Sequence, residues 1–106
     1  MNFTQTVAFR CHDAQKLIEL AAQWDENQAA SDIMGYIGNR VLADRDDPGR
    51  YVMVADFGVV DPDVPAVDES LRNNDRPETR EWAQKLLDII DGEPEYRHYD
   101  EIYRTG

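Results

Sequence analysis

Hydrophobic and polar positions alternate at the beginning of the chain. From Phe3 to Cys11 apolar residues occupy most of the odd-numbered positions, and this period of two predicts a β-strand. From Ala14 to Trp24 apolar residues recur every three or four positions, which predicts an amphipathic helix with Asp13 as its N-cap. The polar stretch from Asp25 to Asp32 predicts the end of this helix.

The middle of the chain has the composition of two β-strands joined by a tight turn. The run from Tyr36 to Ala43 and the run from Tyr51 to Phe57 are rich in β-branched and aromatic residues. Between them, the segment from Asp44 to Arg50 contains Asp-Pro-Gly, in which proline fixes φ and glycine can take a positive φ. The pattern predicts a β-hairpin.

The last third of the chain predicts a loop, a helix and a strand. The segment Gly58 to Val67 holds two prolines and predicts a loop that could form a restrained lid, and a short helical turn is expected at Asp68 to Asn73. A second amphipathic helix is expected to begin at Pro77 and to end before Gly92. The tyrosine-rich run from Tyr96 to Tyr103 predicts the last strand.

This order of elements predicts an α+β fold of ferredoxin-like βαββαβ type. Such a chain forms a four-stranded antiparallel sheet with two helices on one face. A length of 106 residues fits a single domain spanning residues 1–106. The other sheet face would carry Thr4, Thr6 and Ala8, and a second copy of the chain is its natural cover, so we expect a homodimer.

The charge of the chain narrows the classes of partner. The sequence has 22 acidic and 11 Lys and Arg residues, for a formal net charge of −11. Such a surface repels phosphate backbones and anionic membranes, so we expect no nucleic-acid and no membrane partner. The lone Cys11 is expected to be a packing residue, and because the N-terminus lacks a secretion signal, a cytoplasmic location is expected.

Several short motifs carry a family resemblance. The motifs are Gly35-Tyr36-Ile37-Gly38, Arg40-Val41-Leu42, the run from Pro48 to Val54, and Phe57. They resemble the antibiotic biosynthesis monooxygenase family, in which Gly-aromatic-aliphatic-Gly opens the second strand and Arg-Tyr-aliphatic opens the third. The resemblance implies a dimeric α/β barrel. It also implies oxidation of a small aromatic, quinol or polyketide-like compound by O₂ without a cofactor.

The same resemblance implies that Asn, Trp, Tyr and Arg side chains form the active site. Residues of these types occur here as Trp82, Asn73, Asn74, Tyr36 and Arg40. Each also has a structural interpretation. Trp82 is expected in the core with its indole N–H hydrogen-bonded, the two asparagines suit a turn or cap, the tyrosine suits a strand rim, and the arginine suits an ion pair.

We expect no metal, haem or flavin. Haem-degrading members of the family share an Asn on the first strand and a Trp and a His on the second helix, whereas this chain has Thr4, Thr6 and Trp82 without that His. Two alternatives stay open: a polyketide cyclase or isomerase on the same barrel, and a non-catalytic dimeric ligand-binding or stress-response domain. An enzyme would enclose a pocket between sheet and helices, and a non-catalytic domain would fill that space with side chains.

Overall fold

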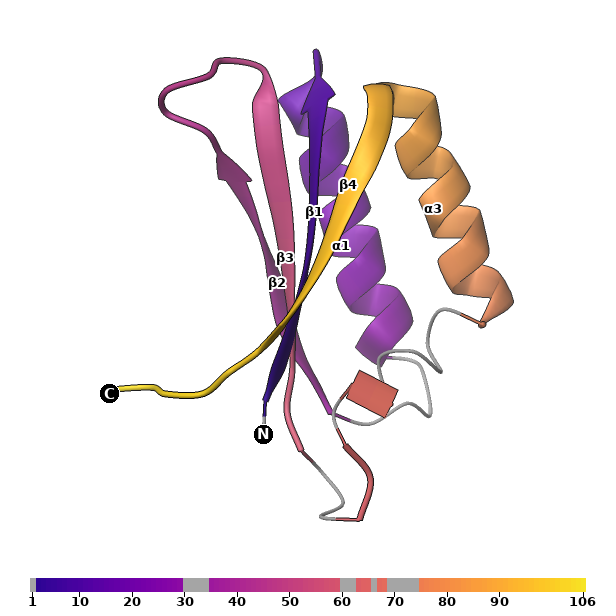
Figure 1. Ribbon diagram of the computed structural model, residues 1–106. Helices are drawn as coiled ribbons and strands as arrows, with labels where there is room; N and C mark the ends of the chain where they lie inside the picture. The colour runs from indigo at the N-terminus through magenta and orange to yellow at the C-terminus, as the bar shows by residue number, and fades with distance from the viewer. Residues whose placement is uncertain (1, 30–34, 60–62, 66, 69–74) are drawn as a thin grey trace.

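A four-stranded sheet with two helices on one face forms the framework of the molecule (Figure 1). The computed structural model describes residues 2–29, 35–59, 63–65, 67–68 and 75–106. In chain order the elements are β1 (Phe3–Cys11), α1 (Ala14–Ala29), β2 (Tyr36–Ala43), β3 (Arg50–Phe57), α3 (Pro77–Ile89) and β4 (Ile90–Asp100). The strand order is β2-β3-β1-β4, and each neighbouring pair is antiparallel. The predicted ferredoxin-like fold is confirmed.

The core lies between the sheet and the two helices. Asp13 caps α1 as predicted, because its carboxylate accepts the backbone N–H of Lys16 at 3.3 Å. Leu17 of α1 and Leu86 of α3 are completely buried in the main cluster, and Phe57 of β3 is completely buried in a second cluster with Phe3. The main cluster of buried side chains comprises Val7, Phe9, Cys11, Leu17, Leu20, Trp24, Met53, Trp82, Leu86 and Ile90.

Helix α1 ends inside the polar stretch that was predicted to end it. That stretch runs from Asp25 to Asp32, and the helix continues into it as far as Ala29. Gln28 follows Trp24 by four residues and therefore lies on the same helix face, where both side chains are buried. Between them Asp25 and Glu26 are exposed and Asn27 is half-buried, so the polarity of these residues does not oppose the helix.

Strand β4 begins earlier than predicted. It starts at Ile90, paired with Cys11, rather than at Tyr96. The pairing with β1 is interrupted by a bulge between Ala8 and Arg10. The extra β4 residues opposite this bulge include Gly92, whose φ is +76°, a conformation that glycine adopts without strain. The bulge lets a segment containing a glycine and a proline remain in the sheet.

The strand also ends before its predicted limit. Asp100 is the last residue of β4, and the backbone N–H of Glu101 donates to the carbonyl of Asn2 at 2.8 Å. Beyond this bond the chain leaves the sheet as an extended tail, visible at the C-terminus in Figure 1. Ile102 and Tyr103 of this tail are 88% and 80% exposed. The tail therefore presents two large apolar side chains to solvent.

The connection from β3 to α3 is described only in part. The predicted lid Gly58–Val67 includes residues 60–62 and 66, which lie outside the described residues, as does most of the predicted helical turn Asp68–Asn73. Val67 packs against the pair of buried rings formed by Phe3 and Phe57. No helix in the described ranges is long and apolar enough to cross a membrane.

Candidate functional site

A small cavity lies between the sheet and the two helices. Its volume is about 90 Å³. The apolar walls are formed by Val7, Trp24, Met53, Ala55, Trp82 and Ala83, and the polar side chains at its surface are Gln5, Asn39, Thr79 and Tyr96. Every strand and both helices contribute at least one of these residues, so the cavity depends on the assembled fold.

Two tryptophans form one side of the cavity. The rings of Trp24 on α1 and Trp82 on α3 are 4.9 Å apart between centroids, at an interplanar angle of 53°. The indole N–H of Trp82 donates to the backbone carbonyl of Leu20 at 2.7 Å. The indole N–H of Trp24 is buried and has no acceptor within the part of the chain that the structure describes. A buried donor without an acceptor is costly and uncommon, so this group is a candidate for ligand contact.

A bulge in β2 decides which side chains face the cavity. Tyr36 pairs with Phe57 and Gly38 pairs with Asp56, so Ile37 is an extra residue in the strand. Beyond the bulge the alternation of faces is shifted by one position. Asn39 therefore lies on the helix-covered face together with Tyr36, although the two residues are an odd number of positions, three, apart in the sequence.

Asn39 belongs to a chain of hydrogen bonds. Its amide nitrogen donates to the carbonyl of Ala21 at 3.2 Å and to the hydroxyl oxygen of Tyr36 at 2.8 Å. The Tyr36 hydroxyl in turn donates to a carboxylate oxygen of Asp25 at 3.0 Å. Burial, as the largest cause, and the neighbouring Asp25 carboxylate raise the pKa of Tyr36 to about 12. The hydroxyl therefore keeps its proton at neutral pH.

The site residues that were predicted from the sequence lie in different environments in the structure. Trp82 lines the cavity, with its N–H already bonded to Leu20. Tyr36 holds Asn39 rather than lining the cavity itself. Arg40 is exposed and follows Asn39 by one position, so it lies on the opposite face of the sheet from Trp82. The other two candidates, Asn73 and Asn74, lie outside the described residues.

Two residues of the site were missed by the sequence reasoning. Trp24 was expected only as a core residue, and Asn39 was not considered. A strand with strict alternation places Tyr36, Gly38 and Arg40 on one face, and the bulge that breaks this alternation has no clear signal in the sequence. The glycine pair at Gly35 and Gly38 was a hint, since glycine is frequent where strands bend or bulge.

The cavity offers hydrogen bonds rather than a proton acceptor. Among the described residues, no carboxylate and no imidazole lines it. Tyr96 is the titratable group at its wall, and burial raises the pKa of its phenol. No group of three metal-binding side chains is present in the described ranges. The described lining therefore combines an apolar wall with a few hydrogen-bonding side chains.

Comparison with known proteins identifies the fold. No protein family model and no curated protein matched the sequence. Among solved structures, SnoaB, a cofactor-independent oxygenase from Streptomyces nogalater, is similar with a TM-score of 0.73 and 17% identity, over 97% of this chain and 95% of that chain. A proposed antibiotic biosynthesis monooxygenase from Deinococcus radiodurans has a TM-score of 0.70 and 12% identity, over 100% and 97%. Rv0793 from Mycobacterium tuberculosis has a TM-score of 0.72 and 11% identity, over 100% of both chains. The chain has the fold of the antibiotic biosynthesis monooxygenase proteins.

Proposed function

We propose that this protein is a cofactor-independent monooxygenase that oxidises a small aromatic quinol or phenol with O₂. The observation that carries the proposal is the apolar cavity between sheet and helices, walled by Trp24 and Trp82. The buried N–H of Trp24 has no acceptor among the residues that the structure describes. The similarity of the fold to that of SnoaB, described as a cofactor-independent oxygenase, supports the same reaction class.

The size of the cavity favours a single ring. Its volume is about 90 Å³. An apolar protein cavity of about 150 Å³ holds benzene, and sites for drug-sized ligands are several times larger. A monocyclic quinol therefore needs only a small outward movement of the cavity wall. A three-ring anthrone would need a much larger one, so it is the poorer candidate.

Such a substrate can supply all of the electrons for the reaction. After its hydroxyl proton leaves to solvent, the phenolate carries carbanion character at a ring C–H carbon, and this carbon forms a bond to O₂. The product is a peroxide whose ring carbon still carries its hydrogen. The O–O bond then breaks, the hydrogen leaves with the outer oxygen as hydroxide, and the ring carbon becomes a C=O group. The ring is oxidised to a quinone, one oxygen atom enters the product, and the other becomes water.

The protein's task in this scheme is orientation and exclusion of water. Because no carboxylate or imidazole of the described residues lines the cavity, deprotonation depends on the acidity of the substrate itself. A dry apolar wall protects the peroxide from side reactions, and fixed hydrogen-bond donors stabilise the developing negative charge. The rate should therefore rise with pH through the substrate's own pKa.

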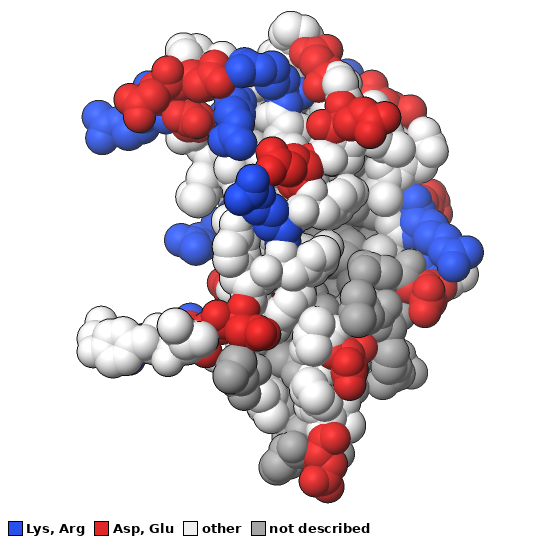
Figure 2. Space-filling view, viewed as in Figure 1, with Lys and Arg blue, Asp and Glu red and all other residues white. Residues whose placement is uncertain are grey.

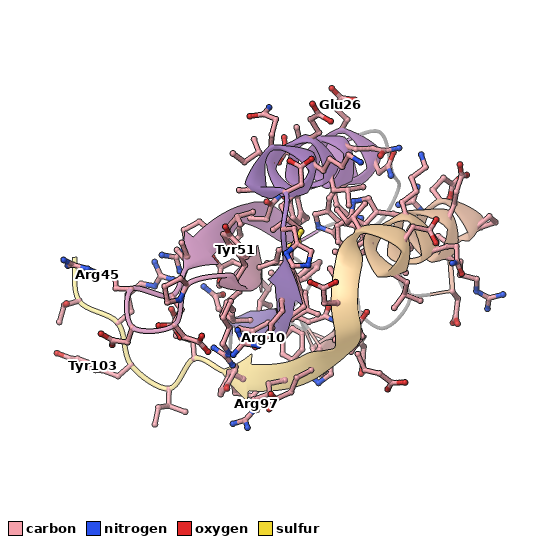
Figure 3. The ribbon with its side chains drawn as sticks, turned by 90° about the horizontal axis from the view of Figure 1, so that it is seen from above. Arg10, Glu26, Arg45, Tyr51, Arg97 and Tyr103 are labelled. Carbon is pink, nitrogen blue, oxygen red and sulfur yellow. The ribbon has the colours of Figure 1, made fainter. Side chains whose placement is uncertain are left out.

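We also propose that a second copy covers the open face of the sheet. This face has a shallow groove of about 320 Å³ lined by Thr6, Ala8, Arg50, Val52, Arg97 and Tyr99, among other residues. Figure 3 shows Arg97 on the side of the sheet away from α1, and Tyr103 on the projecting tail. A strand surface with apolar groups and no covering helix favours association with another chain.

Oxygen consumption tests the enzymatic proposal. Purified protein treated with chelator is mixed with a panel of monocyclic quinols, and uptake of O₂ and incorporation of one ¹⁸O atom into the product are measured. Ala83→Leu fills the cavity and should lower the rate at least tenfold, whereas Ala22→Leu, an exposed alanine of α1, should leave it unchanged. Uptake that never exceeds the protein-free rate would favour the non-catalytic ligand-binding alternative.

A further inference from the structure

The orientation of the Asn39 amide is fixed by its partners. The carbonyl of Ala21 can only accept a hydrogen bond, so the amide atom that faces it must be the nitrogen. The same nitrogen donates to the Tyr36 hydroxyl, so both of its hydrogens are used. The polar atom of Asn39 that is left for a ligand is therefore Oδ1, which can only accept a hydrogen bond.

The surrounding hydrogen bonds hold this orientation. Tyr36 accepts a hydrogen bond from Asn39 and donates its own proton to Asp25. The direction of donation is therefore fixed for both hydrogen bonds. The pKa of Tyr36, raised to about 12, keeps that proton in place across the neutral and mildly alkaline range. The aromatic ring of Tyr36 is held in turn by an edge contact with Phe57, at 5.8 Å between centroids.

The indole of Trp24 complements this acceptor. The carbonyl of Ala21, which accepts from Asn39, lies three positions before Trp24 on α1. The Asn39 amide therefore contacts α1 about one turn away from the Trp24 indole. Both side chains line the same otherwise largely apolar cavity. A ligand hydroxyl can donate to an amide oxygen and accept from an indole N–H, whereas an ether oxygen can only accept.

We propose that Asn39 is a specificity-determining residue, whose Oδ1 accepts a hydrogen bond from the hydroxyl of an aromatic ligand, with Tyr36 as the residue that positions it. This inference rests on the proposed function and assigns the protein atom that distinguishes a free ring hydroxyl from an ether. Rings of the same size without a donor would enter the cavity but leave Oδ1 without a partner.

Binding of three matched ligands tests the inference. Phenol carries a donor and an acceptor, anisole an acceptor alone, and toluene neither, and their dissociation constants are measured by NMR titration of the tryptophan indole signals. Phenol should bind about tenfold more tightly than anisole, the value expected for one hydrogen bond at a half-buried site. Asn39→Leu should abolish this preference, and Arg40→Leu, the neighbouring residue on the other sheet face, should preserve it.

A second variant guards against misfolding of the first. Tyr36→Phe removes one partner of the Asn39 amide and keeps the ring, so the preference for phenol should fall without disappearing. Equal affinity for phenol and anisole in the wild-type protein would overturn the inference, as would a preference that survives Asn39→Leu. Absence of binding by all three ligands would overturn both this inference and the proposed function. A preference for phenol without oxygen uptake would support Asn39 and refute the oxygenase.

Discussion

Trp24 and Trp82 face each other with their ring centroids 4.9 Å apart, yet only Trp82 has an acceptor for its indole N–H among the described residues. The two side chains are equally buried, at 7% and 8% exposure. They differ in what their polar atoms do. The Trp82 N–H joins α3 to the backbone of α1, whereas the Trp24 N–H has no acceptor in the described part of the chain.

This difference predicts unequal effects of two identical substitutions. Trp82→Phe removes the hydrogen bond to Leu20 as well as ring volume, and Trp24→Phe removes ring volume and an unsatisfied donor. We expect Trp82→Phe to cost about 1 kcal/mol more unfolding free energy than Trp24→Phe, since a net hydrogen bond is worth about that amount. Urea denaturation of both variants measures it. Equal losses would show that the bond to Leu20 adds nothing to stability.

The two adjacent leucines of α3 provide a test of the core. Leu86 is completely buried and Leu87 is 47% exposed. Leu86→Ala should lower the unfolding free energy by about 2–5 kcal/mol, because it leaves a void in the packed interior. Leu87→Ala has nearly the same intrinsic helix propensity change and should cost less than about 1 kcal/mol. Similar midpoints of denaturation for the two variants would contradict the placement of α3.

Tyr36 should titrate later than an ordinary tyrosine. Its pKa is raised from 10.0 to about 12, with burial as the largest cause, so the folded state favours the protonated form. The stabilisation linked to Tyr36 is therefore complete below pH 10 and is lost as the pH rises through about 12. Absorbance of the phenolate, followed during alkaline titration, should show a group titrating near pH 12 that Tyr36→Phe removes, whereas the raised titration of Tyr96 should remain. Loss of an early-titrating group instead would refute the hydrogen bond to Asp25.

Association of two copies should become stronger as salt is added. Each chain carries a net charge of −11, so two copies repel each other at low ionic strength. In Figure 2 much of the basic surface lies beside acidic side chains. Light scattering at micromolar protein and moderate salt should give the mass of a dimer.

A pair of variants locates the contact surface of that dimer. Val52→Asp places a charge on the open sheet face and should produce a monomer, whereas Ile18→Asp, on the exposed side of α1, should not. A wild-type monomer in moderate salt would remove the dimeric barrel from consideration. A dimer disrupted by Ile18→Asp alone would move the interface to the helices.

Much of the fold could be predicted because its elements have clear periods and clear ends. The strand from Phe3 to Cys11, the cap at Asp13, and the helix beginning at Pro77 are confirmed. The boundary that failed at the start of β4 depends on a tertiary contact. The strand begins at Ile90 rather than at Tyr96 because Cys11 of β1 supplies a partner there, whereas α1 ends within the polar stretch predicted to end it.

The candidate site was less accessible to sequence reasoning for the same physical reason. Residue type suggested Arg40 and Tyr36. The sheet face on which a strand residue lies can be predicted from the sequence only if the alternation of faces is regular along the strand. The extra residue Ile37 shifts that count, so Asn39 faces the cavity and Arg40 faces away from it. The burial of the Trp24 indole against Trp82 depends on packing between two helices, which no local pattern encodes.

The bulge at Ile37 also affects how this chain should be matched to distant relatives. A relative whose second strand lacks the extra residue needs a gap at that position, although both proteins would share the same sheet. Without the gap, an alignment upstream of the hairpin would slip by one position, and aromatic residues at the start of the strand would be matched to side chains on the other face. Cavity residues of distant relatives are therefore better matched through the β3 residues with which they pair than through their order in the sequence.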